Sequence, residues 1–209
     1  MYSPKKRLLV IVVCTLPILI SFFHNEENIF FLSRMIEQPG RVGSVAPSSK
    51  SLADCMVQEA LSVIKQSNDV VVEIGPGTGC ITRVLLEQGV AAERLICVEA
   101  DPALHKYMTE HFPSVQTILG DAAELATILP EHYGEVSVVI SGVPLKNLPL
   151  DKEKEIIQAC CSVLRSSGKL IQFTYGVRPP SVAPGLFRQF VGFIFLNLPP
   201  AFVWSFTKV

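Results

Sequence analysis

Short apolar runs alternate with segments of helical length from about residue 50 to residue 175. Such alternation is typical of a parallel β-sheet with helices on both faces. Ser48 and Ser49 are suitable N-caps for a first helix that runs to about Lys65. We expect strands at Val70–Ile74, Leu95–Glu99, Val115–Leu119, Val136–Ser141 and Leu170–Thr174. We expect further helices over residues 79–88, 102–111, 122–129 and 151–165.

The pattern changes after Tyr175, where a proline-rich stretch, RPPSVAPG, leads into two more apolar runs. These runs cover residues 190–198 and 201–207 and are joined by Pro199 and Pro200. A tight turn between consecutive strands makes them an antiparallel pair. The predicted fold is therefore an α/β domain with a seven-stranded, mostly parallel sheet that ends in a C-terminal antiparallel hairpin.

Another apolar run, LLVIVVCTLPILISFF, covers residues 8–23 and follows three basic residues at positions 5–7. As a helix it would span about 24 Å, less than the roughly 30 Å of a bilayer core, and Pro17 would weaken it. No signal-peptide cleavage site follows. We therefore expect a hydrophobic, membrane-associating segment at residues 1–29 and a globular domain at residues 30–209. A surface or re-entrant anchor is favoured, and a spanning helix and a mis-assigned start stay open.

The net charge of −1 conceals a strong asymmetry. Residues 1–50 carry a net charge of +3, residues 51–155 one of −9, and residues 156–209 one of +5 without any acidic residue. The last stretch also holds more than half of the aromatic residues. A basic, aromatic end suits an anionic lipid surface better than duplex nucleic acid. The six cysteines form no CxxC pair, so we expect reduced thiols in a cytosolic compartment and no metal.

The strongest motif is VVEIGPGTG, residues 71–79, which ends the first predicted strand and opens a helix. Open α/β sheets bind their ligands at this place. Gly75, Gly77 and Gly79 let the backbone approach a ligand closely, and Glu73 precedes them. The motif is neither a Walker loop, since no Lys-Ser or Lys-Thr follows it, nor a G-x-G-x-x-G turn.

Two further acids end the next two predicted strands. Glu99 stands at the exposed end of the second strand, where a carboxylate can accept hydrogen bonds from both ribose hydroxyls. Asp121, which Ala122 follows, ends the third strand and can accept from an adenine amino group. Together with the glycines, these acids predict a site for a nucleoside-containing cofactor.

The stretches VVEIGPGTG, ICVEAD and LGDA resemble motifs I, II and III of the class I S-adenosylmethionine (SAM) methyltransferases, which have a Rossmann-like fold. From about Phe30 to the C-terminus, the chain is similar to the bacterial soluble-type phospholipid N-methyltransferases. This resemblance implies that SAM is the cofactor and that phosphatidylethanolamine is methylated towards phosphatidylcholine. It also implies that a loop containing Ser44 lies over the methionine end of SAM. The stretches that carry it are FLSRMIEQPGRVGSVAPSSKSLADCM (31–56), SGVPLKNLP (141–149), QFTYG (172–176) and LNLPPAFVW (196–204).

The rRNA adenine dimethylases are related to this group, so N6-methylation of adenine in RNA is the alternative function. Those enzymes carry Asn/Asp-Pro-Pro-aromatic after the fourth strand, where the ring stacks on the base. This chain has Ser-Gly-Val-Pro at residues 141–144 and an acidic body, which favours a lipid over a nucleic acid. A second alternative is a non-catalytic SAM-fold binding protein at the membrane, and the intact glycines and acids argue against it.

Several residues are candidates for contact with the methyl acceptor. The Tyr175 ring could hold an ethanolamine ammonium by a cation–π contact, or pack on the core. Ser141 could hydrogen-bond the acceptor nitrogen or serve only its turn, and a carbonyl near Gly142 or a water could take the proton. Arg178 and Arg41 could pair with the lipid phosphate, because arginine binds phosphate through two hydrogen bonds.

The reaction that the resemblance implies is direct in-line transfer to an amine, with no covalent intermediate and no metal, so positioning dominates catalysis. We expect the protein to work at the cytoplasmic face of the membrane, bound peripherally or through its N-terminal segment. Its expected partners are an anionic phospholipid surface and the head-group amine of a lipid.

Overall fold

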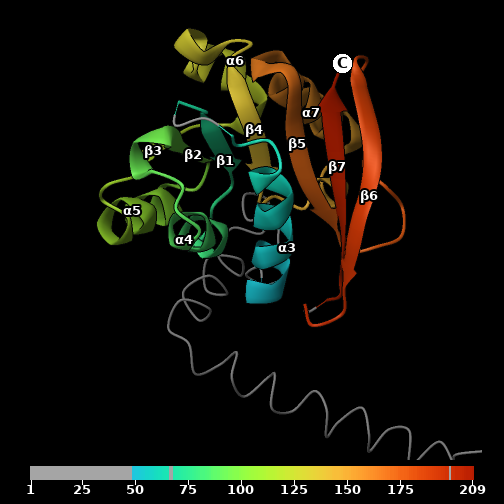
Figure 1. Cartoon of the computed structure of the whole chain (residues 1–209), viewed down its shortest axis with the longest axis horizontal. Coiled ribbons are helices and arrows are strands. Elements are labelled where there is room, and N and C mark those ends of the chain that lie inside the picture. The colour runs from blue at the N-terminus through green and yellow to red at the C-terminus, as the bar shows by residue number, and fades with distance from the viewer. Residues whose placement is uncertain (1–48, 66–67, 198) are drawn as a thin grey trace, which may run out of the picture.

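A seven-stranded sheet forms the centre of the computed structural model, which describes residues 49–65, 68–197 and 199–209 (Figure 1). The strand order is β3-β2-β1-β4-β5-β7-β6. β1 to β5 pair in parallel, whereas β7 is antiparallel to both β5 and β6, which confirms the predicted sheet. The strands are β1 (Val71–Ile74), β2 (Leu95–Glu99), β3 (Gln116–Leu119), β4 (Val136–Ser141), β5 (Leu164–Thr174), β6 (Leu186–Ile194) and β7 (Ala201–Lys208).

The first four strands begin within one residue of their predicted positions, but β5 is longer than predicted, and β6 begins and ends four residues earlier than predicted. β5 begins at Leu164, and its first part, residues 165–168, is polar and therefore invisible to a hydrophobic pattern. β6 begins at Leu186, directly after Gly185, whose φ of +80° ends the proline-rich loop. Glycine adopts this conformation without steric cost.

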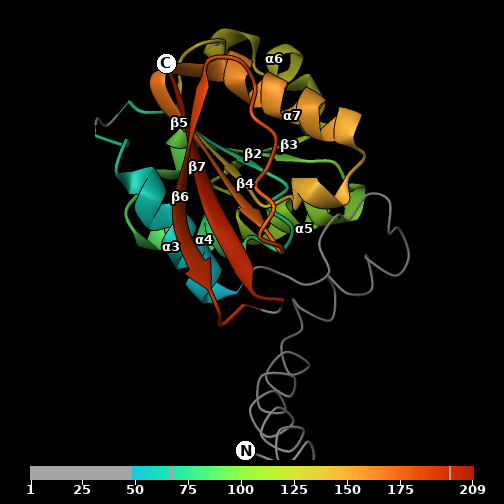
Figure 2. The ribbon, with the colours of Figure 1, turned by 90° about the vertical axis from the view of Figure 1, so that its right-hand side faces the viewer.

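Helices cover both faces of the sheet (Figure 2). α3, α4 and α5 pack on one face, and α6 and α7 on the other. The helix predicted at residues 122–129 divides into a 3-10 turn, η2, and the short helix α6. The helices are α3 (Lys50–Leu61), α4 (Cys80–Glu87), α5 (Pro102–His111), α6 (Leu125–Ile128) and α7 (Leu150–Val163), and the 3-10 turns are η1 (Ala92–Arg94), η2 (Ala122–Glu124), η3 (Pro130–His132) and η4 (Leu145–Asn147).

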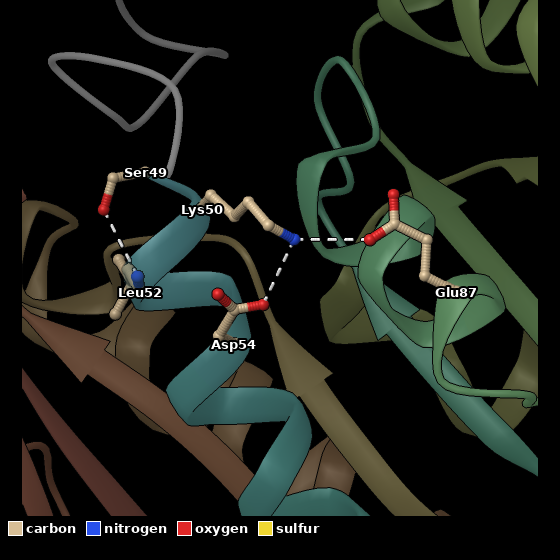
Figure 3. A network of polar contacts seen from close by, with 5 residues as sticks. All are labelled: Ser49, Lys50, Leu52, Asp54 and Glu87. Carbon is tan, nitrogen blue, oxygen red and sulfur yellow. Dashed lines mark hydrogen bonds and ion pairs between the residues drawn. The ribbon is translucent and has the colours of Figure 1, made fainter.

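The first turn of α3 is capped and tied to α4 (Figure 3). The Ser49 hydroxyl accepts a hydrogen bond from the Leu52 N–H at 3.2 Å, as an N-cap does. The Lys50 ammonium lies 3.3 Å from a carboxylate oxygen of Glu87 on α4 and 3.5 Å from one of Asp54. The hydrogen bond with Glu87 and the charge of Asp54 raise the pKa of Lys50. These groups are exposed, so the two ion pairs contribute little to the stability of the domain.

The N-terminal part of the chain lies outside the described residues. It includes the predicted membrane-associating segment 1–29, the predicted cap Ser48 and the predicted site residues Arg41 and Ser44. Among the helices that the structure does describe, none is both long and apolar enough to cross a bilayer.

Candidate functional site

A pocket of about 700 Å³ opens at the carboxyl edge of the sheet. It lies where the strand order reverses between β1 and β4, the position at which open α/β sheets bind ligands. Its wall is mostly apolar and includes the first turns of α7. The predicted cofactor residues that line it are Gly75, Glu99, Asp121 and Ala122.

Glu99, the last residue of β2, is only 5% exposed, so the expectation of an exposed strand end is wrong. Its Oε2 accepts a hydrogen bond from the Gly77 N–H at 3.1 Å, and its Oε1 accepts one from the Asp101 N–H at 2.9 Å. Burial raises the pKa of Glu99, and these two N–H groups oppose only part of that effect. Each oxygen retains a second lone pair. The carboxylate can therefore accept from a diol while it holds the glycine turn in place.

Asp121 follows β3 and contributes a second carboxylate to the pocket. Its Oδ1 accepts from the Ala123 N–H at 2.9 Å, and its Oδ2 lies 2.8 Å from the ammonium nitrogen of Lys152. Partial burial acts to raise the pKa of Asp121, but the bond with Lys152 and the N–H group outweigh it and lower the pKa. Sequence reasoning missed Lys152. The available signal was its place in the first turn of the helix that follows β4.

Glu73, in β1, is fully buried and does not itself line the pocket. Its Oε2 accepts a hydrogen bond of 2.6 Å from the Thr82 hydroxyl, whereas its Oε1 has no partner among the described residues. Burial raises the pKa of Glu73 to about 7. Buried polar atoms are nearly always hydrogen-bonded, so an unpartnered acceptor two residues before the pocket-lining Gly75 fits a donor group supplied by a ligand.

The buried Glu73 should make the ligand-free protein less stable as pH rises. Its folded pKa lies above that of an unfolded glutamate, so its stabilising contribution is full below about pH 4.5 and is lost as pH rises through 7. Relative to wild type, Glu73→Gln should gain about 3 kcal/mol of unfolding free energy between pH 4.5 and pH 8. Urea unfolding at both values measures this gain, with the exposed Glu124→Gln as control. If the difference in unfolding free energy between Glu73→Gln and wild type were the same at both pH values, the prediction would be wrong.

Glycines let the loops after β1 and β4 pass close together. Gly75 has a φ of +63°, and a Cβ there would overlap the Val143 side chain. A Cβ on Gly142 would overlap the carbonyl oxygen of Gly75. A Cβ on Gly79 would instead overlap the Phe112 ring at the end of α5. Gly75 and Gly142 therefore shape the pocket edge, whereas helix packing explains Gly79.

The loop after β4 holds the predicted acceptor residue Ser141, which is fully buried. Its hydroxyl donates to the Val143 carbonyl at 3.1 Å and accepts from the Val143 N–H at 3.3 Å. Gln172 in β5 also donates to that carbonyl, from Nε2 at 2.7 Å. These contacts favour the interpretation of Ser141 as a turn residue, and its contact with an acceptor stays a prediction. Sequence reasoning missed Gln172, although a glutamine within an apolar strand was an available signal.

Tyr175 and Arg178, two further predicted acceptor residues, do not line the pocket. Tyr175 follows β5 and packs edge-on against Phe173, with 5.2 Å between the ring centroids, which favours its packing interpretation. Arg178 is exposed in the loop after β5. Acceptor contacts of these two residues stay predictions. Two predicted residues lie outside the described residues, so the acceptor contact of Arg41 and the place of Ser44 over the methionine end of SAM stay predictions as well. The described histidines, cysteines and acids form no cluster that could hold a metal ion.

A buried ion pair joins the loops that follow β4 and β5. Glu153, in α7, is 1% exposed, and its carboxylate oxygens lie 3.0 and 3.3 Å from the ammonium nitrogen of Lys146 in η4. Its Oε1 also accepts from the Ser181 N–H, in the proline-rich loop, at 2.7 Å. One carboxylate therefore holds both loops. Sequence reasoning missed Glu153, because a charged residue in an amphipathic helix is usually exposed to solvent.

Removal of this carboxylate should destabilise the domain. Glu153→Ala leaves the Ser181 N–H and the half-buried Lys146 ammonium without their partner, at an expected cost of about 2–3 kcal/mol. Urea unfolding measures the change. The control, Asp151→Ala, removes an exposed carboxylate from the same helix. Equal free energies of unfolding for the two variants would show that the ion pair does not stabilise the domain.

Comparison with known proteins identifies relatives of this chain. The family model described as "Methyltransferase domain" matches residues 71–168. The ornithine lipid N-methyltransferase of Singulisphaera acidiphila is 31% identical over 185 residues, which cover 84% of this chain and 93% of that protein. The ribosomal RNA small subunit methyltransferase A of Chlorobium chlorochromatii is 31% identical over 77 residues, which cover 37% of this chain and 28% of that protein. The crystal structure of TrmN from Thermus thermophilus superposes with a TM-score of 0.60 at 17% identity, covering 85% of this chain and 53% of that one, and shares the fold.

Proposed function

Because the chain belongs to the class I SAM-dependent methyltransferases, we propose that it transfers the methyl group of SAM to an amine nitrogen in a lipid head group. The observation that carries this proposal is the 31% identity to an ornithine lipid N-methyltransferase over 84% of the chain. The loop after β4 supports it, because residues 141–144, Ser-Gly-Val-Pro, offer no ring on which a purine could stack. The relative that acts on ribosomal RNA matches only 37% of the chain.

The pocket fits SAM, the methyl donor of this family. We assign the ribose hydroxyls to Glu99, whose two oxygens each retain a lone pair, and the adenine amino group to the ionised Asp121. We place the amino group at the methionine end near Gly75, in the region of Glu73, whose Oε1 has no partner among the described residues. When bound, SAM supplies a methyl carbon on a positively charged sulfur, and this carbon bonds to the nitrogen lone pair as the carbon–sulfur bond breaks.

The protein contributes position rather than a nucleophile. The amine must first lose a proton, and the carboxylates that line the pocket, Glu99 and Asp121, are assigned to the nucleoside. A carbonyl of the loop at Gly142 can accept a hydrogen bond from the amine, and water takes the proton. Hydrogen bonds from Ser141 and Gln172 to Val143 hold this loop, so the acceptor meets a fixed edge. Correct placement of two reactants can supply a large part of a rate enhancement.

Two head groups carry a suitable amine. The resemblance of the stretches at residues 141–149 and 196–204 to the phospholipid N-methyltransferases implies phosphatidylethanolamine, and the name of the relative suggests an ornithine lipid. We propose phosphatidylethanolamine as the first substrate, and the cytoplasmic face of the membrane as the location. Of the five basic residues in 156–209, Arg165 and Lys169 pair with Asp69 and Glu59, and the remaining three support an anionic surface as partner.

Incubation with isotope-labelled SAM tests this function. Vesicles with phosphatidylethanolamine, vesicles with ornithine lipid, ribosomal RNA and a protein pool are offered in parallel, and mass spectrometry locates the label. We expect label on the amine of phosphatidylethanolamine. Label on ornithine lipid alone would correct the head group, and label on RNA adenine would replace the proposal with the alternative. SAM binding in calorimetry without label in any pool would favour a non-catalytic binding protein.

A further inference from the structure

We propose that the end of the β6–β7 hairpin docks on an anionic lipid bilayer and so brings head groups to the edge of the pocket. Four side chains between the middle of β6 and this end, Phe190, Phe193, Phe195 and Leu196, are called here the aromatic tip. The inference rests on the proposed lipid substrate and adds the surface through which the enzyme meets that lipid.

The aromatic tip exposes an unusual amount of apolar surface. Phe195 and Leu196, which follow β6, are 75% and 67% exposed, and Phe190 and Phe193 are about half exposed. Single exposed apolar side chains are common, but a group of large ones on one edge strand marks an interaction surface.

The aromatic tip is built on an ordered platform. The Phe193 ring lies 4.7 Å from that of Phe202, and the Phe190 ring lies 5.2 Å from that of Trp204. The Trp204 indole N–H donates to the Thr174 hydroxyl at 3.1 Å, which anchors this platform to β5. Aromatic rings with one side packed and the other exposed suit the interface between head groups and acyl chains.

The aromatic tip lies at the same edge of the sheet as the pocket. Phe202 pairs with Thr174, the last residue of β5, and with Phe193 of β6. β5 is parallel to β1 and β4, and the residues after β1 and β4 line the pocket. In Figure 1 the turn between β6 and β7 accordingly lies at the lower end of the sheet. A bilayer in contact with the aromatic tip would therefore present its head groups to that edge.

Two features favour a bilayer over another partner. The Ser49 N–H donates to Asn197 Oδ1 at 2.9 Å, so the chain enters the domain beside Leu196. The 48 residues that precede Ser49 include the apolar run 8–23, which therefore connects to the domain next to the aromatic tip. In addition, Arg178 is exposed in the loop after β5, at this edge of the sheet, and the Arg188 guanidinium lies 5.8 Å from the centre of the Trp204 ring, so these cations complement an anionic surface.

The single tryptophan of the chain, Trp204, makes the contact measurable. Vesicles of phosphatidylglycerol and phosphatidylethanolamine with brominated acyl chains should quench Trp204 emission in the full chain. The double variant Phe195→Ser/Leu196→Ser should lose most of this quenching and bind these vesicles about tenfold more weakly. The matched control is Phe187→Ser, because Phe187 is 65% exposed on the same strand but pairs with Thr207 at the far end of the hairpin. This variant should behave like wild type.

Co-sedimentation with vesicles without quenching of Trp204 would overturn the proposal, because another part of the chain would then carry the contact. Equal binding to purely zwitterionic phosphatidylcholine vesicles would overturn the anionic partner. A changed oligomeric state of the double variant in analytical ultracentrifugation, with vesicle binding unchanged, would show instead an interface between copies.

Methylation assays separate this proposal from the proposed function. The double variant should methylate vesicle lipid poorly but keep wild-type activity on a short-chain phosphatidylethanolamine dispersed as monomers. Equal losses on both forms would contradict a docking role. If wild type methylated neither form, the proposed function would be wrong, and the quenching result would still decide whether the aromatic tip meets a bilayer.

Discussion

Glu99→Ala should weaken SAM binding by about 100-fold or more. The buried carboxylate offers one free lone pair on each oxygen, and two hydrogen bonds to a charged group contribute roughly 1.5–3 kcal/mol each. The substitution also frees the N–H groups of Gly77 and Asp101, so the glycine turn loses its anchor to β2. Isothermal titration of SAM measures the affinity. The catalytic rate at saturating SAM should fall much less than the affinity, because the acceptor edge is left unchanged.

Two comparisons make this result specific. Glu110→Ala removes an exposed carboxylate from α5 and should leave the affinity for SAM unchanged. Without SAM, Glu99→Ala should change the free energy of urea unfolding little. The variant loses two hydrogen bonds, but it also removes the cost of burying a carboxylate, the burial that raises the pKa of Glu99. An affinity within about threefold of wild type would remove Glu99 from the site.

The fold was predictable because its signal is local. The strands β1, β2 and β4 are buried along their whole length, so continuous apolar runs identify them, and Pro199-Pro200 separates the last two strands. The start of β5 was missed because Arg165 and its polar neighbours extend the strand beyond the apolar run. Hydrophobic patterns find the buried part of a strand rather than its hydrogen-bonded length.

The sequence allowed prediction only of those site residues that lie at the carboxyl ends of strands. Glu99 and Asp121 follow from their positions, because the carboxyl ends of parallel strands share one edge. Glu153 has no such mark, since it is a charged residue near the start of an amphipathic helix, and Lys152 offers only the weak signal of its place in the first turn of that helix. Only the three-dimensional arrangement shows that Lys152 reaches Asp121 and that Glu153 turns inward to Lys146. Contacts between distant loops set these roles, and sequence spacing does not encode them.

Gly142→Ala should lower methyl transfer by about 100-fold, because misplacement of reacting groups by about 1 Å has an effect of this size. The added Cβ would overlap the carbonyl oxygen of Gly75, a backbone atom that cannot turn aside as a side chain can. The loop after β4 must then move away from the pocket edge, although the Gly142 N–H is bonded to the Ile74 carbonyl at 2.8 Å. Overpacking of this kind should also cost about 1–3 kcal/mol of stability. Rate measurements with labelled SAM and urea unfolding test the two effects.

The matched control is Gly176→Ala, in the loop after β5, where an added Cβ meets no atom within 4 Å. It should keep wild-type activity and stability. Titration of the Gly142→Ala variant with SAM distinguishes an effect on the acceptor from an effect on SAM binding. If the acceptor edge has shifted, the rate at saturating SAM falls more than the affinity for SAM. A Gly142→Ala enzyme with wild-type rate and stability would show that the loops after β1 and β4 can separate freely. The close approach of Gly142 to Gly75 would then have no part in positioning the acceptor.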